Sequence, residues 1–176
     1  DLRAVWAELP DDESRMNKAR ELMETLLGDD ELKAHSENWP STENRKNLLF
    51  YEDPDYGFVM NALIKNPGGG AMVHDHGPAW TIYGLVAGTE RIVRFAASEG
   101  DDGRFDITES RSDDCGTGDV DIVAPRVIHS EYAGTQKSIA FIVRSQRSGT
   151  FDQYRYLDDG TREVIRGPEQ IPYDLS

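Results

Sequence analysis

From residue 46 onward the chain is a succession of short strand-like segments separated by turn signals, and this pattern limits the folds open to it. The segments are rich in β-branched and aromatic residues. Glycine, proline and aspartate fill the breaks between them, as turns require. Regularly spaced short strands predict an antiparallel β-sandwich or barrel. We expect strands at 46–51, 58–65, 71–76, 80–86, 90–97, 104–109, 119–123, 127–132, 138–144, 151–157 and 162–166.

The first 35 residues have a helical period instead. A short apolar stripe runs from Leu2 to Leu9 and stops at Pro10, and a longer one runs from Met16 to Leu27. Such stripes predict packing surfaces against the strands. A length of 176 residues fits one domain with a real hydrophobic core. We therefore expect a single domain over 1–176, with a helical cap at 1–37, a β-barrel at 45–166 and an irregular tail at 167–176.

Two histidines lie in one expected strand between glycine turns. His74 and His76 are two positions apart, so alternation along a strand places them on one face, about 7 Å apart, with Asp75 on the other. His129, a third of only four histidines, lies in another strand-like segment. The alternative is that these are ordinary polar residues on a half-exposed strand. We assign that interpretation to His35 and expect the other three to form a metal site.

Three neutral imidazoles suit iron, copper, nickel or zinc and leave coordination positions open. With no ligand charge, the ion would hold an anionic substrate atom such as a thiolate or an enolate strongly. A tetrahedral hydrolytic zinc site is the competing use of the same residues.

The charge balance excludes some partners. Nineteen basic and 33 acidic residues give a net charge of −14, which disfavours nucleic acid and anionic lipid. No apolar run is long enough for a membrane helix. A single cysteine, Cys115, fits a reducing cytoplasm. Because Cys115 follows Asp113-Asp114 and precedes Gly116, we expect it in a polar turn without a role.

Three stretches resemble the metal motifs of a known family. Val73-His74-Asp75-His76, the turn from Gly84 to Glu90, and Pro125-Arg126-Val127-Ile128-His129 are similar to those of cupins, and most similar to the cysteine dioxygenase-like branch. Cupins commonly have a glutamate ligand four or five residues after the second histidine. Trp80 and Thr81 stand there instead, as in the all-histidine ligand set of thiol dioxygenases. The resemblance implies a double-stranded β-helix (jelly-roll barrel) with a helical N-terminal cap.

The resemblance also implies a function. His74, His76 and His129 would bind one iron(II), and a small thiol would react with dioxygen to give a sulfinate. The expected partners are this small-molecule substrate and dioxygen, with a homodimer as a possible assembly. The family's carboxylate-binding arginine falls at Lys46 or its neighbour Arg45. A solvated strand end is the alternative for both residues.

Other candidate pocket residues follow from the same comparison. Thiol dioxygenases often have a Ser-x-His-x-Tyr run on a late strand, whereas this chain has Ser138, Ala140 and Ile142, which would make the pocket drier. A shifted alignment puts Arg144 in the tyrosine's place. Tyr83 is a candidate pocket residue or a core residue. For Glu131, on the face of His129, we expect a solvated side chain, with a role as fourth ligand or as acceptor to a ligand as the alternative.

Two further functions stay open from the sequence. One is a different metallo-cupin enzyme, such as a carbon–carbon-cleaving dioxygenase or a zinc or manganese lyase or isomerase. The other is a non-catalytic cupin that binds a small molecule.

Overall fold

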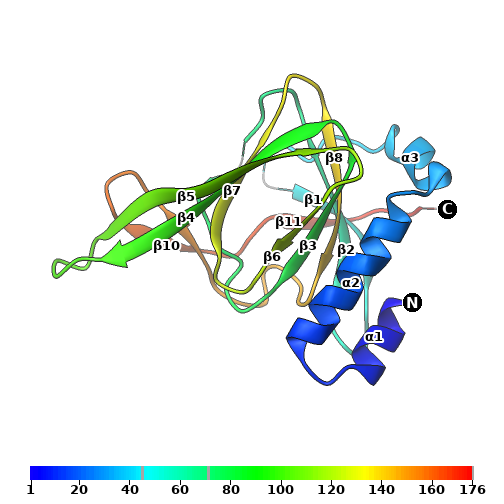
Figure 1. Ribbon diagram of the computed structural model, residues 1–176, viewed down its shortest axis with the longest axis horizontal. Coiled ribbons are helices and arrows are strands. Elements are labelled where there is room, and N and C mark those ends of the chain that lie inside the picture. The colour runs from blue at the N-terminus through cyan, green and yellow to red at the C-terminus, as the bar shows by residue number, and fades with distance from the viewer. Residues whose placement is uncertain (45, 71, 176) are drawn as a thin grey trace.

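The computed structural model describes residues 1–44, 46–70 and 72–175. Three helices come first and pack on one side of the strands (Figure 1). They are α1 (Leu2–Glu8), α2 (Asp12–Leu26) and α3 (Asp30–Ser36). The strands that follow are β1 (Lys46–Glu52), β2 (Val59–Lys65), β3 (Thr81–Ala87), β4 (Thr89–Glu99), β5 (Phe105–Gly116), β6 (Val120–Val123), β7 (Ile128–Ala133), β8 (Ser138–Arg144), β9 (Gln153–Tyr156), β10 (Arg162–Ile165) and β11 (Glu169–Pro172).

The strands form two sheets. The first has the order β11-β1-β2-β8-β3-β6, and the second contains β5-β4-β7 and the β9–β10 hairpin. His74 connects the two parts of the second sheet, because it forms antiparallel bridges with both His129 of β7 and Arg155 of β9. Between β2 and β8 the chain passes repeatedly from one sheet to the other. This strand order is the double-stranded β-helix, so the expected mainly β fold with a helical N-terminal cap is confirmed.

The helical cap covers the first sheet with its apolar stripes. Trp6 of α1 stacks on Trp80 with ring centroids 5.4 Å apart, and it also contacts Phe58. Met23 of α2 lies so close to Gly84 of β3 that an added Cβ there would be 2.6 Å from the Met23 sulfur. Asp11 caps α2 by accepting a hydrogen bond from the Ser14 amide at 2.8 Å. The hydrophobic core therefore lies between the cap and the first sheet.

The segment expected as a strand at 71–76 pairs only at isolated positions. Gly70 forms one isolated bridge, His74 forms two, and Ala71 lies outside the described residues. The glycine turn before this segment and Gly77, whose φ is +54°, confine regular pairing to a short stretch around His74. The expected strand at 71–76 is therefore wrong as a continuous element. His74 and His76 nevertheless both face the metal centre, as the strand pattern predicted.

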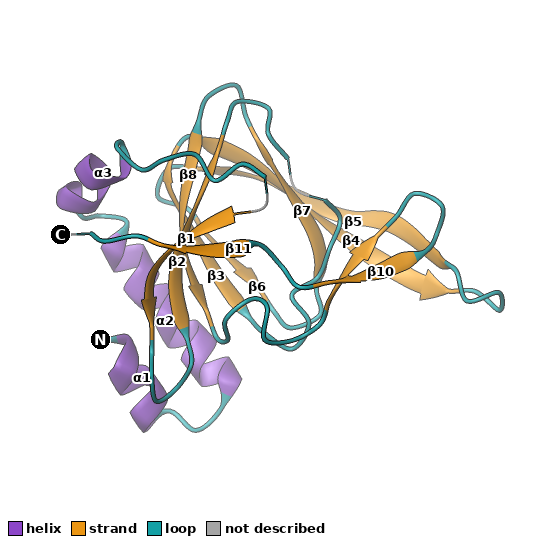
Figure 2. Cartoon of the chain, turned by 180° about the vertical axis from the view of Figure 1, so that it is seen from behind, coloured by secondary structure: helices purple, strands orange, loops and turns teal. Residues whose placement is uncertain are grey.

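Two other expectations are corrected at the edges of the sheets. β5 continues to Gly116 and pairs with β4 along its length, so Cys115 lies in a strand and not in a turn. The hairpin of β4 and β5 extends away from the barrel on the side opposite the helices (Figure 1). The tail at 167–176 is not wholly irregular, because β11 pairs in parallel with β1 (Figure 2). Pro172 is tolerated because β11 is an edge strand.

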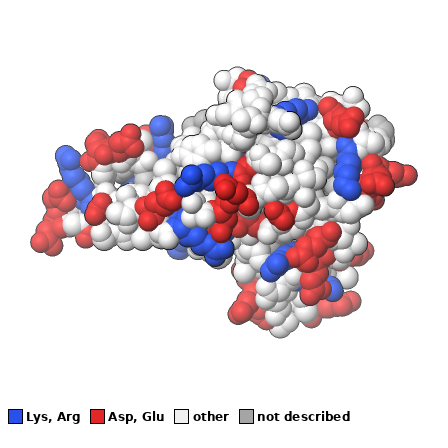
Figure 3. Space-filling view, turned by 45° about the horizontal axis from the view of Figure 1, so that its top comes forward, with Lys and Arg blue, Asp and Glu red and all other residues white. Residues whose placement is uncertain are grey.

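Acidic and basic side chains are interspersed over the face shown in Figure 3. Among the described residues, no helix combines the length and the apolar character that crossing a membrane would require.

Candidate metal centre

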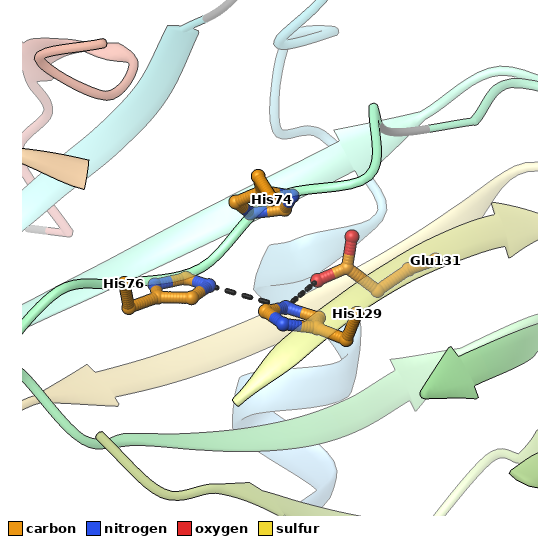
Figure 4. A group of neighbouring side chains, drawn as sticks. All are labelled: His74, His76, His129 and Glu131. Atoms are coloured by element: carbon orange, nitrogen blue, oxygen red, sulfur yellow. Dashed lines mark hydrogen bonds and ion pairs between the residues drawn. The ribbon is translucent and has the colours of Figure 1, made fainter. Parts of the chain in front are cut away.

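Four side chains converge between the sheets (Figure 4). One ligand atom from each of His74, His76, His129 and Glu131 lies within 4.8 Å of those of the other three. Nε2 of His129 is 3.1 Å from Nε2 of His76 and 3.0 Å from Oε1 of Glu131. The structure thus brings together the three histidines that the sequence singled out, and it adds a carboxylate.

The backbone holds two of these residues side by side. The amide of His74 donates to the carbonyl of His129 at 3.0 Å, and the reciprocal bond is 2.9 Å long. Asp75 points away from the histidines, as its strand position predicted. Its carboxylate accepts from the amides of Gly77 at 2.8 Å and Tyr154 at 3.2 Å, which fastens the turn after His76.

Hydrogen bonds to carbonyls decide which imidazole nitrogens face the centre. Nδ1 of His74 is 2.8 Å from the carbonyl oxygen of Met72, and Nδ1 of His129 is 3.2 Å from that of Val127. A carbonyl oxygen only accepts, so in each ring Nδ1 carries the hydrogen. Nε2 of His74 therefore has a free lone pair, which is the form that binds a metal, whereas Nε2 of His129 is hydrogen-bonded to the carboxylate of Glu131.

Burial keeps two of the rings neutral. It lowers the pKa of His74 to about 4, with the nearby His129 acting in the same direction. It also lowers the pKa of His76 well below its ordinary value, and the positive charge of Arg144 adds to this effect. Both imidazoles are therefore uncharged at neutral pH and can donate their lone pairs.

Glu131 is not the solvated glutamate that the sequence suggested, because only 6% of the residue is exposed. Burial by itself raises the pKa of its carboxyl, but the charges of His129 and Lys65 and the hydrogen bond to His129 outweigh this and hold that pKa well below its ordinary value. Glu131 is thus a buried anion that faces the histidines. The signal in the sequence was its position two residues after His129, on the same strand face.

The donor set fits a divalent transition metal. The facing atoms are one carboxylate oxygen and three imidazole nitrogens, which are the atoms through which these side chains bind divalent metals. Two ligands bonded at about 2.1 Å and at right angles are about 3.0 Å apart. The two observed contacts of 3.0 and 3.1 Å match this spacing. Imidazole and carboxylate ligands together suit iron, manganese, zinc or nickel.

A cavity of about 500 Å³ opens beside this centre. His74, His76 and Glu131 line it. Of the expected substrate-binding residues, Tyr83 and Arg144 also line it, and Lys46 stands at the exposed start of β1 on its rim. Arg45, the fourth, lies outside the described residues. His35 is exposed on α3 and does not take part in the centre.

A buried polar network that the sequence did not predict borders the cavity. The carboxylate of Glu90 accepts hydrogen bonds from Lys65 at 2.6 Å, Ser138 at 2.6 Å and Tyr83 at 2.9 Å. Burial raises the pKa of Tyr83 well above its ordinary value, and the charge of Glu90 raises it further. The Tyr83 hydroxyl therefore stays protonated. Lys65 and Glu90 carried no recognisable signal in the sequence because they meet only through sheet pairing.

The late strand β8 makes part of the cavity apolar. Ser138 bonds to Glu90, Ala140 is buried, and Ile142 lines the cavity. Arg144, at the end of the same strand face, is buried as well. Burial lowers its pKa to about 10, although the charge of Glu131 opposes this effect, so the guanidinium remains charged at neutral pH.

Comparisons with known proteins show likenesses of shape only. No protein-family model matches the chain, and no curated protein sequence matches it significantly. An uncharacterized conserved protein with a double-stranded β-helix domain from Klebsiella pneumoniae is similar over 72% of this chain and 89% of that one, with 14% identity and a TM-score of 0.47. The cupin domain of Schizosaccharomyces pombe Cnp3 is similar over 57% and 64%, with 9% identity and a TM-score of 0.45.

A recombinant oxalate oxidase in complex with glycolate is similar over 51% of this chain and 42% of that one, with 18% identity and a TM-score of 0.41. The chain thus spans about half the length of several solved structures that it matches. The fold assignment rests on the strand order of this chain itself. Fold and site together define a double-stranded β-helix protein with a candidate metal centre of three histidines and one glutamate.

Proposed function

We propose that this chain is a mononuclear metal-dependent enzyme, specifically an iron(II) dioxygenase that oxidises a small thiol to a sulfinate. The observation that carries the proposal is the convergence of His74, His76, His129 and Glu131 beside a cavity large enough for a small molecule. A divalent iron ion would supply open positions at which a thiolate and dioxygen become neighbours.

The residues of the chain would perform three tasks. His74, His76 and His129 would hold the ion through Nε2, and the carboxylate of Glu131 would either bind it or accept a hydrogen bond at its edge. Apolar residues of the cavity wall, such as Leu63, Val123 and Ile142, would limit the entry of water. The buried cation Arg144 would attract an anionic substrate into the cavity.

The absence of a histidine and a tyrosine from β8 limits how closely the chemistry can follow that of the thiol dioxygenases which it resembles. Ala140 and Ile142 cannot donate a hydrogen bond to a bound substrate. We therefore expect the substrate to be less polar at that wall than cysteine, with its thiolate directed to the centre and its carbon chain along Ile142.

Metal analysis of protein purified without added metal, followed by oxygen uptake with a panel of thiols and diketones, tests the proposal. Iron at near-full occupancy, thiol-dependent oxygen uptake and a sulfinate product support it. Oxygen uptake with diketones but not with thiols would overturn the thiol as substrate and indicate a dioxygenase that cleaves carbon–carbon bonds. Zinc at full occupancy with no oxygen consumption would overturn it.

One observation favours a second candidate, a manganese or zinc lyase or isomerase. Glu131 brings a carboxylate to the centre. Manganese prefers oxygen ligands such as carboxylates to nitrogen ligands such as imidazoles. The Lys65, Tyr83 and Glu90 network beside the cavity offers groups for proton transfer. Turnover that needs manganese or zinc and proceeds equally without oxygen would establish this class.

The remaining expectations continue as proposals. A non-catalytic binding protein would keep its ligand affinity in a His129→Ala variant, whereas a metal enzyme would not. The single cysteine is the ground for proposing a cytoplasmic location. A small molecule and dioxygen are the proposed partners, and gel filtration with light scattering would test the homodimer.

A further inference from the structure

Arg144 is a buried cation whose side-chain hydrogen bonds, among the described residues, go to hydroxyl groups. Only 4% of the residue is exposed, and its side chain lines the cavity. Its Nε donates to the hydroxyl of Thr81 at 3.1 Å, and its Nη1 donates to the hydroxyl of Ser148. Both acceptors are neutral, and Arg144 forms no ion pair with any residue that the structure describes. Because a buried charge is costly when it is unpaired, the arrangement favours an anion supplied from the cavity.

Gln153 gives a second, independent observation at the same cavity. It is the first residue of β9, it lines the cavity, and only 1% of it is exposed. Its side-chain Nε2 is buried and has no hydrogen-bond partner within the described part of the chain. Buried amide groups are almost always hydrogen-bonded in folded proteins. An acceptor on a bound molecule would satisfy this one.

The two donors meet around Ser148 and Gly167. Ser148 accepts the hydrogen bond from Arg144. A Cβ placed on Gly167 would be 2.9 Å from the Cβ of Ser148 and 3.1 Å from Oε1 of Gln153. Gly167 and Pro168 also line the cavity. Arg144 and Gln153 therefore share one end of the cavity, beneath the segment that leads into β11.

This end of the cavity is linked to the metal centre. The hydroxyl of Thr81, which accepts from Arg144, lies 3.4 Å from Nδ1 of His76. One side chain therefore separates the guanidinium from a metal ligand. A molecule held by Arg144 and Gln153 would reach the centre with an atom only a few bonds away from its anionic group.

We propose that Arg144 and Gln153 form a carboxylate-binding subsite, so that the substrate is a small carboxylic acid whose other end reaches the metal centre. The second part of this inference rests on the proposed function, whereas the subsite itself does not. A carboxylate matches the observations because its two oxygens fit the fork of a guanidinium and leave a lone pair for the amide of Gln153. Lys46, to which the resemblance pointed, lies at the exposed rim instead.

Calorimetric titration of chelator-treated protein with propionate and with the neutral analogue propionamide tests the subsite without metal. We expect propionate to bind and propionamide to bind at least about tenfold more weakly. Arg144→Met should weaken propionate binding about tenfold or more, since charge-assisted hydrogen bonds are lost. Arg147→Met is the matched control, because Arg147 pairs with Glu52 at the surface, and its affinity should stay within about twofold of the parent's.

Gln153 variants keep the test decisive if Arg144→Met does not fold. Gln153→Leu removes an unpartnered amide, so it should retain the thermal unfolding midpoint while weakening propionate binding several-fold. Gln153→Glu should place an internal carboxylate next to Arg144 and abolish propionate binding in a folded protein. Equal affinity for propionate and propionamide, or unchanged propionate affinity in the folded variants, would overturn the subsite. Loss of affinity in Lys46→Met but not in Arg144→Met would also overturn it.

The two proposals fail separately. Protein that binds propionate through Arg144 but never takes up metal would retain the subsite and lose the proposed function. Protein that takes up iron and consumes oxygen with thiols lacking a carboxylate, but shows no preference for propionate, would retain the function and lose the subsite.

Discussion

His74 and His129 form an antiparallel bridge in which each amide donates to the other's carbonyl, at 3.0 and 2.9 Å. Their ring centroids are 4.6 Å apart. Two residues far apart in the sequence are thus fixed by backbone pairing and not by side-chain contact alone. A metal centre built on such a bridge is preorganised, because its ligands need little movement to meet an ion.

Replacement of His129 by alanine should remove the metal. The variant loses a ligand that contacts both His76 and Glu131. Loss of a residue that only orients a metal ligand typically lowers metal affinity about tenfold or more, so we expect the loss of a ligand itself to lower it at least about tenfold. Metal content by mass spectrometry after equilibration with limiting iron(II) measures this. His35→Ala is the control, since His35 is exposed on α3. Full metal content in His129→Ala would contradict the assigned centre.

The Glu131→Gln variant tests whether the negative charge of this side chain contributes to metal affinity. Glutamine fills the same space but cannot supply a negative charge, so we expect the affinity for iron(II) to fall about ten- to hundredfold while the fold is retained. Competition with a metal-binding dye measures the affinity. Glu109→Gln, at an exposed position of β5, should behave like the parent. An unchanged affinity in Glu131→Gln would place this carboxylate outside the centre.

Gly84→Ala should destabilise the contact between the cap and the barrel. The new methyl group would lie 2.6 Å from the sulfur of Met23 and 3.1 Å from Leu27, so we expect a loss of about 1–3 kcal/mol in the free energy of unfolding. Urea unfolding followed by tryptophan fluorescence measures it. Gly116→Ala, whose methyl group would meet nothing closer than 3.8 Å, is the control. In a Met23→Ala background, where the methyl group has room, Gly84→Ala should lower the free energy of unfolding by less than it does in the parent. If the losses of the two substitutions simply add in the double variant, the methyl group does not collide with Met23.

Cys115 should react slowly with thiol reagents. Burial, together with the negative charges of Asp121, Asp119 and Asp113, raises its pKa to about 11. Only the thiolate reacts, so at pH 8 the rate should be about a hundredfold below that of an ordinary cysteine. The rate of labelling by an aromatic disulfide should rise about tenfold per pH unit from pH 7 to 10. Asp121→Asn should accelerate it, and a plateau near pH 9 in the parent would disprove the raised pKa.

Several features of this protein could be predicted because they depend on local rules. Alternation along a strand put His74 and His76 on one face and Asp75 on the other, and the structure retains this arrangement even though the segment pairs only at His74 and Gly70. Turn residues located most of the strands. The length of β5 was missed, because its polar sequence around Asp113 resembles a turn when its partner β4 is unknown.

The sequence by itself determined the strand-rich barrel, the helical cap and the three histidines that are candidate ligands. Strand and helix periodicity depend on neighbouring residues, and the ability of a histidine to bind a metal depends on its residue type. Only the tertiary structure decided that Glu131 is buried, that Lys65 is paired with Glu90, and that Arg144 faces a cavity with Gln153. The physical reason is that burial and ion pairing depend on which strands lie next to and opposite one another. That arrangement is set by packing across the two sheets and not by the residues of any one strand.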